Sequence, residues 1–267
     1  MGCCVIDGIA FIVAGAAVGF CVGVTGVGGG SLMTPLLTMM GVPLHTAIGT
    51  DLLYASMTKS GGAVVHSMKR NINWRITGML AAGSIPAALL TLWMLESYFG
   101  NANAYKHVLT RSLGFMLLLT GASLVFRRQL QRLHDASPLQ SHLRQALDNN
   151  ATAFTLAMGV MLGVLVTLSS VGAGAFGVMI LFSLFPRLPT IQIIGTDVTH
   201  AVLLTLVAGL GHMKMGNVDF TLLTWLLMGS LPAIVAGTLL SSRLHEDVIR
   251  PLLGGTLMLL SIKFMFF

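Results

Sequence analysis

The chain of 267 residues is 55% hydrophobic and only 9% charged, and its mean hydropathy is +0.85. Soluble domains contain about 25% charged residues, so this composition argues strongly against a soluble globular protein. The formal net charge of +6 rests on few charges that fall mainly between hydrophobic segments, which is not the pattern of a nucleic-acid-binding protein. The sequence predicts a polytopic membrane protein.

Ten hydrophobic segments predict helices, five in each half of the chain. In the first half they are Val5–Val24, Ser31–Met40, Thr46–Val65, Arg75–Leu95 and Val108–Phe126. In the second half they are Ala151–Leu168, Ala175–Phe185, Ile191–Gly211, Phe220–Leu240 and Val248–Phe267. A helix crosses a hydrocarbon core of about 30 Å with about 20 residues. The second segment of each half is about half that length, so we expect two short helices.

Each short segment follows a glycine-rich break. The first break is "GVGGG" at residues 26–30, and the second is "SSVGAG" at Ser169–Gly174. Irregular backbone at membrane depth leaves N–H and C=O groups that lipid cannot pair, so it is tolerated only where it lines a cavity or is buried by protein. Glycines can alternatively let helices pack closely, which is our interpretation of Gly15 and Gly19. For the two breaks we favour a cavity, because both halves contain the break and the short helix.

The two halves resemble each other. "IGTD" occurs at Ile48–Asp51 and again, 146 residues later, at Ile194–Asp197. The same offset aligns Gly26 with Gly172, and "GSIPA" at 83–87 with "GSLPA" at 229–233. Such an internal repeat predicts two homologous units, residues 1–126 and 151–267, joined by a polar linker at 127–150. Together the units form one membrane domain.

Positive charge predicts the orientation in the membrane. If the short segments are crossings, most Lys and Arg residues, including those of segment 127–150, fall on one side. The positive-inside rule then places this linker in the cytoplasm and both termini outside, which makes the halves inverted copies. If the short segments are re-entrant, the halves run parallel. We favour inversion, because inverted repeats with interrupted helices at corresponding positions are typical of alternating-access transporters.

Several motifs of the chain together resemble those of a known family. "GVTGVGGGSLMTPLL", "AIGTDL", "VGAGAFG", "IIGTDV" and "GSLPA" together resemble the sulfite exporter TauE/SafE family of membrane permeases, over nearly the whole chain. The resemblance implies an anion permease of the bacterial inner membrane that moves sulfite, sulfonates such as sulfoacetate, or related organosulfur anions. The second half departs from the glycine motif at Ala173, Ala175 and Phe176, so we expect the two half-sites to contribute unequally.

The residues themselves also favour anion binding. The short helices begin near Gly30 and Ala175, so their unpaired N–H groups and positive dipole ends would face the breaks, with hydroxyl groups beside them. Any one of these hydroxyls can instead bond to its own helix backbone. The candidate substrate-binding residues are Thr25, Gly26, Gly28, Gly29, Gly30, Ser31, Thr50, Ser169, Ser170, Gly172, Gly174 and Thr196.

Ionisable residues predicted to lie within the membrane are few, and the candidates for coupling or for the transport pathway are Asp51, Lys59, Asp197 and His200. The two aspartates occupy equivalent positions, where they could bind a proton or cation, or could accept N–H bonds from the broken backbone. Lys59 could supply charge to an anion pathway or extend to the membrane surface. His200 could relay protons or serve only in helix packing.

The sequence therefore predicts an all-α integral membrane protein that transports a small anion, sulfite or an organosulfonate or another organosulfur anion, by alternating access, with proton linkage left open. One alternative is a transporter or channel for another small ion, such as a metal cation, but no ligand cluster repeats at metal-binding spacing. Another is an intramembrane enzyme, yet neither GxSxG nor HExxH occurs. We expect no cofactor, no metal and no nucleic acid; the expected partners are the anion, the lipid bilayer and a coupling ion, and an oligomer is compatible with the sequence.

Overall fold

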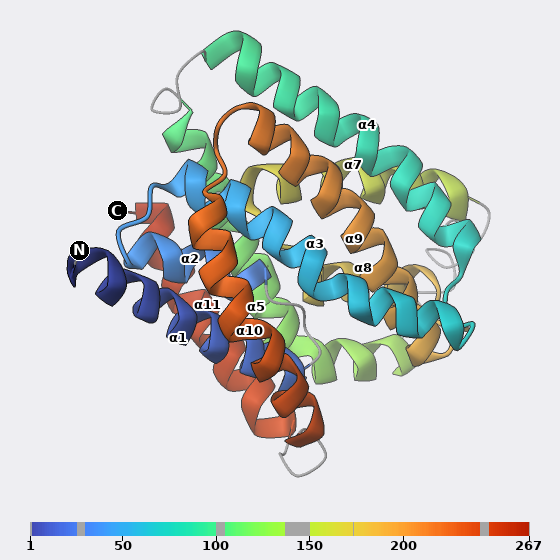
Figure 1. Cartoon of the computed structure of the whole chain (residues 1–267). Helices are drawn as coiled ribbons and strands as arrows, with labels where there is room; N and C mark the ends of the chain where they lie inside the picture. Colours follow the sequence, from blue (N-terminus) through green and yellow to red (C-terminus); the bar gives the residue numbers. More distant parts are fainter. Residues whose placement is uncertain are drawn as a thin grey trace.

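The structure, a computed structural model, describes residues 2–25, 30–99, 105–136, 150–172, 174–240 and 246–266. All regular elements within these ranges are α-helices, as Figure 1 shows, and the predicted all-α fold is confirmed. The helices of the first half are α1 (Gly2–Thr25), α2 (Gly30–Met39), α3 (Leu44–Met68), α4 (Trp74–Phe99) and α5 (Lys106–Ala136). Those of the second half are α7 (Ala151–Ser169), α8 (Ala175–Leu184), α9 (Thr190–Lys214), α10 (Phe220–Leu240) and α11 (Glu246–Phe266).

Each segment that the sequence predicts as helical is helical, and most ends agree within a few residues. The largest difference is at α5, which continues to Ala136 although the sequence predicts a linker from residue 127. The added stretch is rich in Arg, Gln and Leu, which are good helix formers, so the helix propagates beyond its apolar part. Within the described residues, five helices (α4, α5, α7, α9 and α10) are long and apolar enough to cross a membrane.

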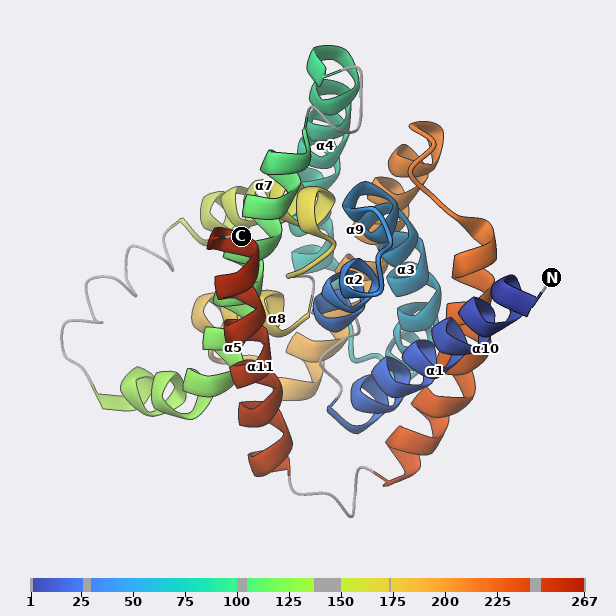
Figure 2. The ribbon, with the colours of Figure 1, turned by 90° about the vertical axis from the view of Figure 1, so that its left-hand side faces the viewer.

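The helices pair across the two halves of the chain. In both views α1 lies beside α10 and α5 lies beside α11, while α4 packs on α7 (Figures 1 and 2). The first helix of each half thus packs against the fourth helix of the other half. The third helices, α3 and α9, contact each other in the interior, and the short helices α2 and α8 each lie against the third helix of their own half.

Glycines allow these helices to approach closely. A Cβ atom added at Gly15 or Gly19 of α1 would overlap the backbone oxygens of Leu226 and Ser230 in α10. Gly163 of α7 faces the backbone oxygen of Ser84 in α4 in the same way. These contacts agree with the interpretation of Gly15 and Gly19 as packing residues, because small residues let the backbones of membrane helices come together.

Two equivalent hydrogen bonds connect the third helices to the opposite half. The Thr50 hydroxyl accepts a hydrogen bond from the Asp219 N–H at 3.1 Å, and the Thr196 hydroxyl accepts one from the Asn73 N–H at 3.0 Å. Both donors and both acceptors are 146 residues apart, the offset of the sequence repeat. The two halves therefore make matching contacts with each other, and their inverted orientation in the membrane stays a prediction.

Candidate functional site

Asp51 occupies the interior, where α3 passes the short helix α2. Its side chain is completely buried, and its Oδ2 atom accepts a 2.5 Å hydrogen bond from the Thr34 hydroxyl of α2. Thr34 is buried as well, so the pair lies away from solvent and lipid. A hydrogen bond to a carboxylate is stronger than one between neutral groups, and this contact fixes α2 against α3.

The Asp51 carboxylate also lies near Ser170 of the break in the second half. Oδ1 has no hydrogen-bond partner among the described residues, and neither has the hydroxyl of Ser170, which is also buried. The Ser170 hydroxyl interacts with the Asp51 carboxylate, but the pair does not reach hydrogen-bond geometry. Buried polar atoms are nearly always paired, so two unsatisfied oxygens in one place indicate a position for a further polar group.

The backbone of the second break explains how Ser170 reaches this place. Helix α7 ends at Ser169, and Ser170 follows in the left-handed conformation, with φ of 59°. The Ser169 hydroxyl donates to the Leu165 carbonyl at 2.6 Å and accepts from the Val171 N–H at 3.2 Å, so it stabilises the turn itself. Gly172 has φ of 115°, a conformation that favours glycine.

Helix α8 begins directly behind this break, with Gly174 as its N-cap residue. The Gly177 N–H donates to the Gly172 carbonyl at 3.1 Å, and the Val178 N–H donates to the Gly174 carbonyl at 2.8 Å. These bonds join the broken backbone to the first turn of α8. The N–H groups of Ala175 and Phe176, at the start of α8, have no partner within the helix and lie next to the break.

Asp197 of α9 approaches the same first turn. Its carboxylate lies against Gly177, where an added Cβ atom would overlap Oδ1. The side chain is 2% exposed, although Asp197 lies in a helix that is long and apolar enough to span the membrane. Gly177 is thus the residue that lets a carboxylate lie against α8.

Lys59 provides a buried positive charge that interacts with the two aspartates. It is buried in α3, and its ammonium group interacts electrostatically with both carboxylates, most strongly with Asp197 of the other half. The side chain therefore does not extend to the surface. With both carboxylates ionised, the three side chains together carry one net negative charge.

His200 lies one turn after Asp197 and points to α4. Its Nε2 atom is 2.8 Å from the Ser84 hydroxyl, and both side chains are buried. The equivalent residues in the repeat, Tyr54 and Ser230, have buried hydroxyls without a hydrogen-bond partner among the described residues. The interior is thus polar on both sides of α3 and α9, but its chemistry differs between the halves.

The structure brings together part of the predicted site. Asp51, Lys59, Asp197 and Ser170 meet in the interior, and Ser169, Gly172 and Gly174 shape the break beside them. The hydroxyls of Thr50 and Thr196 accept hydrogen bonds from backbone N–H groups of the opposite half. That these two residues also bind substrate stays a prediction. Gly26, Gly28 and Gly29 lie outside the described residues, and for Thr25, Gly30 and Ser31 only the helical backbone is described.

Three residues of the site, Thr34, Ser84 and Gly177, were not predicted from the sequence. Thr34 aligns with Ile180 in the repeat and Gly177 aligns with Ser31, so the repeat gave no signal for either. Ser84 belongs to the repeated "GSxPA" motif, which could have identified it. Among the described residues, no group of three His, Cys, Asp or Glu side chains is placed to hold a metal ion.

Comparison with known proteins places this chain in a family. The family described as "Sulfite exporter TauE/SafE" matches residues 11–264. The chain is 34% identical to "Probable membrane transporter protein YjnA" of Bacillus subtilis (strain 168), covering 96% of this chain and 98% of that protein. It is 26% identical to "Probable membrane transporter protein YdhB" of the same organism, over 90% of this chain and 96% of the relative.

A third relative, a "Probable membrane transporter protein" of Xylella fastidiosa (strain 9a5c), is 28% identical over 88% of this chain and 85% of its own length. No solved structure matches the chain. The match to the family extends over both halves, including the two breaks and the buried aspartates. The chain belongs to the sulfite exporter TauE/SafE family of membrane transporters.

Proposed function

We propose that this transporter moves a small sulfur oxyanion, sulfite or an organosulfonate, through the interior site around Asp51 and Lys59. The observation that carries the proposal is a pair of buried oxygens without hydrogen-bond partners among the described residues, Asp51 Oδ1 and Ser170 Oγ, the second of which lies at the break before α8. A hydroxyl donor, a lysine ammonium and the start of a helix are groups that bind oxyanions. The family description, which names sulfite, supports the substrate class.

Charge balance supports linkage to protons. An oxyanion that enters a site with two ionised aspartates and one lysine would add negative charge to a buried cluster that is already negative. An unbalanced charge is costly in a low-dielectric interior. A proton taken up by one aspartate removes this cost and turns a carboxylate oxygen into a donor. We therefore infer that anion and proton occupy the site together.

The same arrangement disfavours a metal cation as substrate. Lys59 already provides the positive charge that faces the two carboxylates, so a divalent cation would meet a like charge at close range. The proposal also assigns the chain no enzyme activity. For the membrane context we propose the bacterial inner membrane, with segment 127–150 in the cytoplasm and both termini outside, and alternating access around the two breaks.

Transport into proteoliposomes tests the proposal. Sulfite, sulfoacetate, thiosulfate and sulfate are compared as substrates, each with and without an inward proton gradient. We expect saturable uptake of sulfite or sulfoacetate that a proton gradient accelerates. Asp197→Asn is expected to reduce this acceleration. If the Asp197→Asn protein takes up sulfite at the same rate as the unsubstituted protein, with the same dependence on the proton gradient, proton coupling through Asp197 is refuted.

A further inference from the structure

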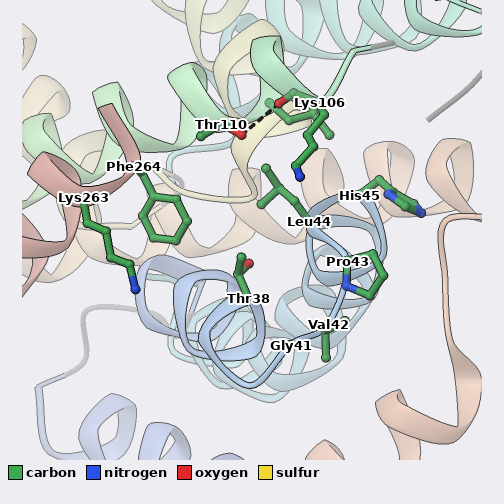
Figure 3. A pocket seen from close by; sticks show the side chains of 11 residues that line it. Thr38, Gly41, Val42, Pro43, Leu44, His45, Lys106, Thr110, Lys263 and Phe264 are labelled. Atoms are coloured by element: carbon green, nitrogen blue, oxygen red, sulfur yellow. Dashed lines mark hydrogen bonds between the residues drawn. The ribbon is translucent and has the colours of Figure 1, made fainter. Parts of the chain in front are cut away.

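A cavity lies away from the buried site, at the far end of the short helix α2. It has a volume of about 420 Å³ and lies between the loop after α2, the first turn of α3, the first turn of α5 and the end of α11. Thr38 contributes from the last turn of α2, and Phe264 closes one side, as Figure 3 shows.

The residues that line this cavity make it basic. Lys106 of α5 and Lys263 of α11 line it together with His45 of α3, and the lining contains no acidic residue. In Figure 3 the two lysine side chains extend toward the cavity from different helices. Neither lysine forms an ion pair with any residue that the structure describes. Their charges are therefore available to a ligand.

Two helix N-termini add to the positive potential. Helix α3 begins at Leu44 behind Pro43, which provides no side-chain cap, and the first intrahelical donor in this turn is the Ala47 N–H. Lys106 is the first residue of α5. A cation at a helix N-terminus is unfavourable, because it adds to the positive end of the helix dipole. An anion bound in the cavity would remove this penalty.

The cavity is connected to the buried site through α2. Thr38, which lines the cavity, donates a 2.9 Å hydrogen bond to the carbonyl of Thr34. Thr34 in turn donates to the carboxylate of Asp51. One turn of helix therefore separates the cavity from the group that contacts the buried aspartate. A ligand in the cavity would therefore lie at the C-terminal end of α2, the helix whose Thr34 hydroxyl donates to Asp51.

We propose that this cavity is a peripheral anion-binding site, which collects a small oxyanion from one side of the membrane before the anion reaches the buried site. The ligand class is an oxyanion with one or two negative charges, such as sulfite, sulfate or a sulfonate. The claim that the cavity binds an anion depends only on the cavity and its lining residues. The claim that the anion then moves to the buried site rests on the proposed transport function. A phosphate of an anionic lipid has the same chemistry, and the test separates the two sources.

The test compares the variant Lys106→Gln/Lys263→Gln with the unsubstituted protein in vesicles of neutral phosphatidylcholine. Sulfate binding is measured by thermal stabilisation of the purified full chain, as the sulfate concentration that gives half of the maximal stabilisation. Transport is measured as the KM and the maximal rate of sulfite uptake. We expect the half-saturating sulfate concentration and the KM to rise about three- to tenfold at low salt, with an unchanged maximal rate, and less at high salt.

Lys214→Gln is the matched control, because Lys214 is an exposed lysine of the same predicted membrane side, with 75% of its side chain exposed and a 3.6 Å ion pair to Glu96. Lys106→Arg/Lys263→Arg keeps the charge and is expected to bind sulfate as the unsubstituted protein does. An effect of the glutamine variant no larger than that of Lys214→Gln overturns the proposal. If the glutamine variant does not fold, loss of sulfate stabilisation in each single Lys→Gln variant tests the same prediction.

The outcomes separate this proposal from the proposed function. Weakened sulfate binding in the glutamine variant, combined with no transport of any tested anion by the unsubstituted protein, supports the site and refutes the transport proposal. Normal sulfite transport with unchanged sulfate binding refutes the site alone. A difference that occurs only in vesicles with phosphatidylglycerol identifies a lipid phosphate as the occupant and overturns the proposal of a soluble anion.

Discussion

The Thr34 hydroxyl donates a 2.5 Å hydrogen bond to Oδ2 of Asp51, which joins the short helix α2 to α3 at the centre of the molecule. The second half has no such bond, because Ile180 takes the place of Thr34 in the repeat. There the aspartate, Asp197, lies against Gly177 of the short helix α8. Two homologous halves thus hold equivalent carboxylates by different means.

Removal of the Thr34 hydroxyl should destabilise the protein and slow transport. Thr34→Val keeps the shape of the side chain but leaves Asp51 Oδ2 buried without a donor, which costs about 1–3 kcal/mol. We expect a lower melting temperature and slower sulfite uptake. Thr224→Val is the control, since Thr224 is exposed and bonds only within its own helix, at 2.8 Å to the Phe220 carbonyl. Equal melting temperatures for the two variants would contradict this prediction.

Removing Lys59 alone should destabilise the protein more than removing the charges of Lys59 and Asp197 together. Lys59→Met leaves two carboxylates buried without their cation, and breaking a buried ion pair costs about 3–5 kcal/mol. In the double variant Lys59→Met/Asp197→Asn one negative charge is removed as well, so we expect thermal stability to recover in part while sulfite uptake stays absent. Melting temperature and uptake are measured on the same preparations. A double variant less stable than Lys59→Met would show that the pair does not interact as described.

Gly177 should not tolerate a methyl group. An added Cβ atom would overlap the Asp197 carboxylate, so Gly177→Ala must displace Asp197 or α8. Overpacking of this kind costs about 1–3 kcal/mol, more than alanine gains in helix propensity, about 1 kcal/mol. We expect lower stability and slower uptake. In Gly61→Ala the new methyl group meets no atom within 4 Å, so this variant should be at least as stable as the unsubstituted protein.

The membrane orientation can be tested with single cysteines in a background without Cys3, Cys4 and Cys21. If segment 127–150 lies in the cytoplasm, Lys106→Cys lies outside and Arg70→Cys lies inside, because α5 and α4 are each one crossing. A membrane-impermeant maleimide added to whole cells should label position 106, and position 70 only after the cells are opened. Labelling of both positions in intact cells would refute the orientation.

Local sequence properties determined much of this protein. Helix formation in a bilayer depends on the transfer energy of consecutive residues, so hydropathy alone located the long helices and the two short ones. A buried ionisable residue is costly wherever it lies in an apolar segment, so Asp51, Lys59, Asp197 and His200 could be identified one by one. The internal repeat could likewise be recognised from the order of residues alone.

The partners of these residues were decided by tertiary packing alone. Lys59 follows Asp51 by eight residues, yet its larger interaction is with Asp197 on a helix from the other half. Thr34 and Gly177 are ordinary residues in sequence and gain their importance from the carboxylates that pack against them. The basic cavity likewise joins Lys106 and Lys263, which are distant in the chain. Transfer energy acts on each segment separately, whereas these contacts depend on how close packing sets separate helices against one another.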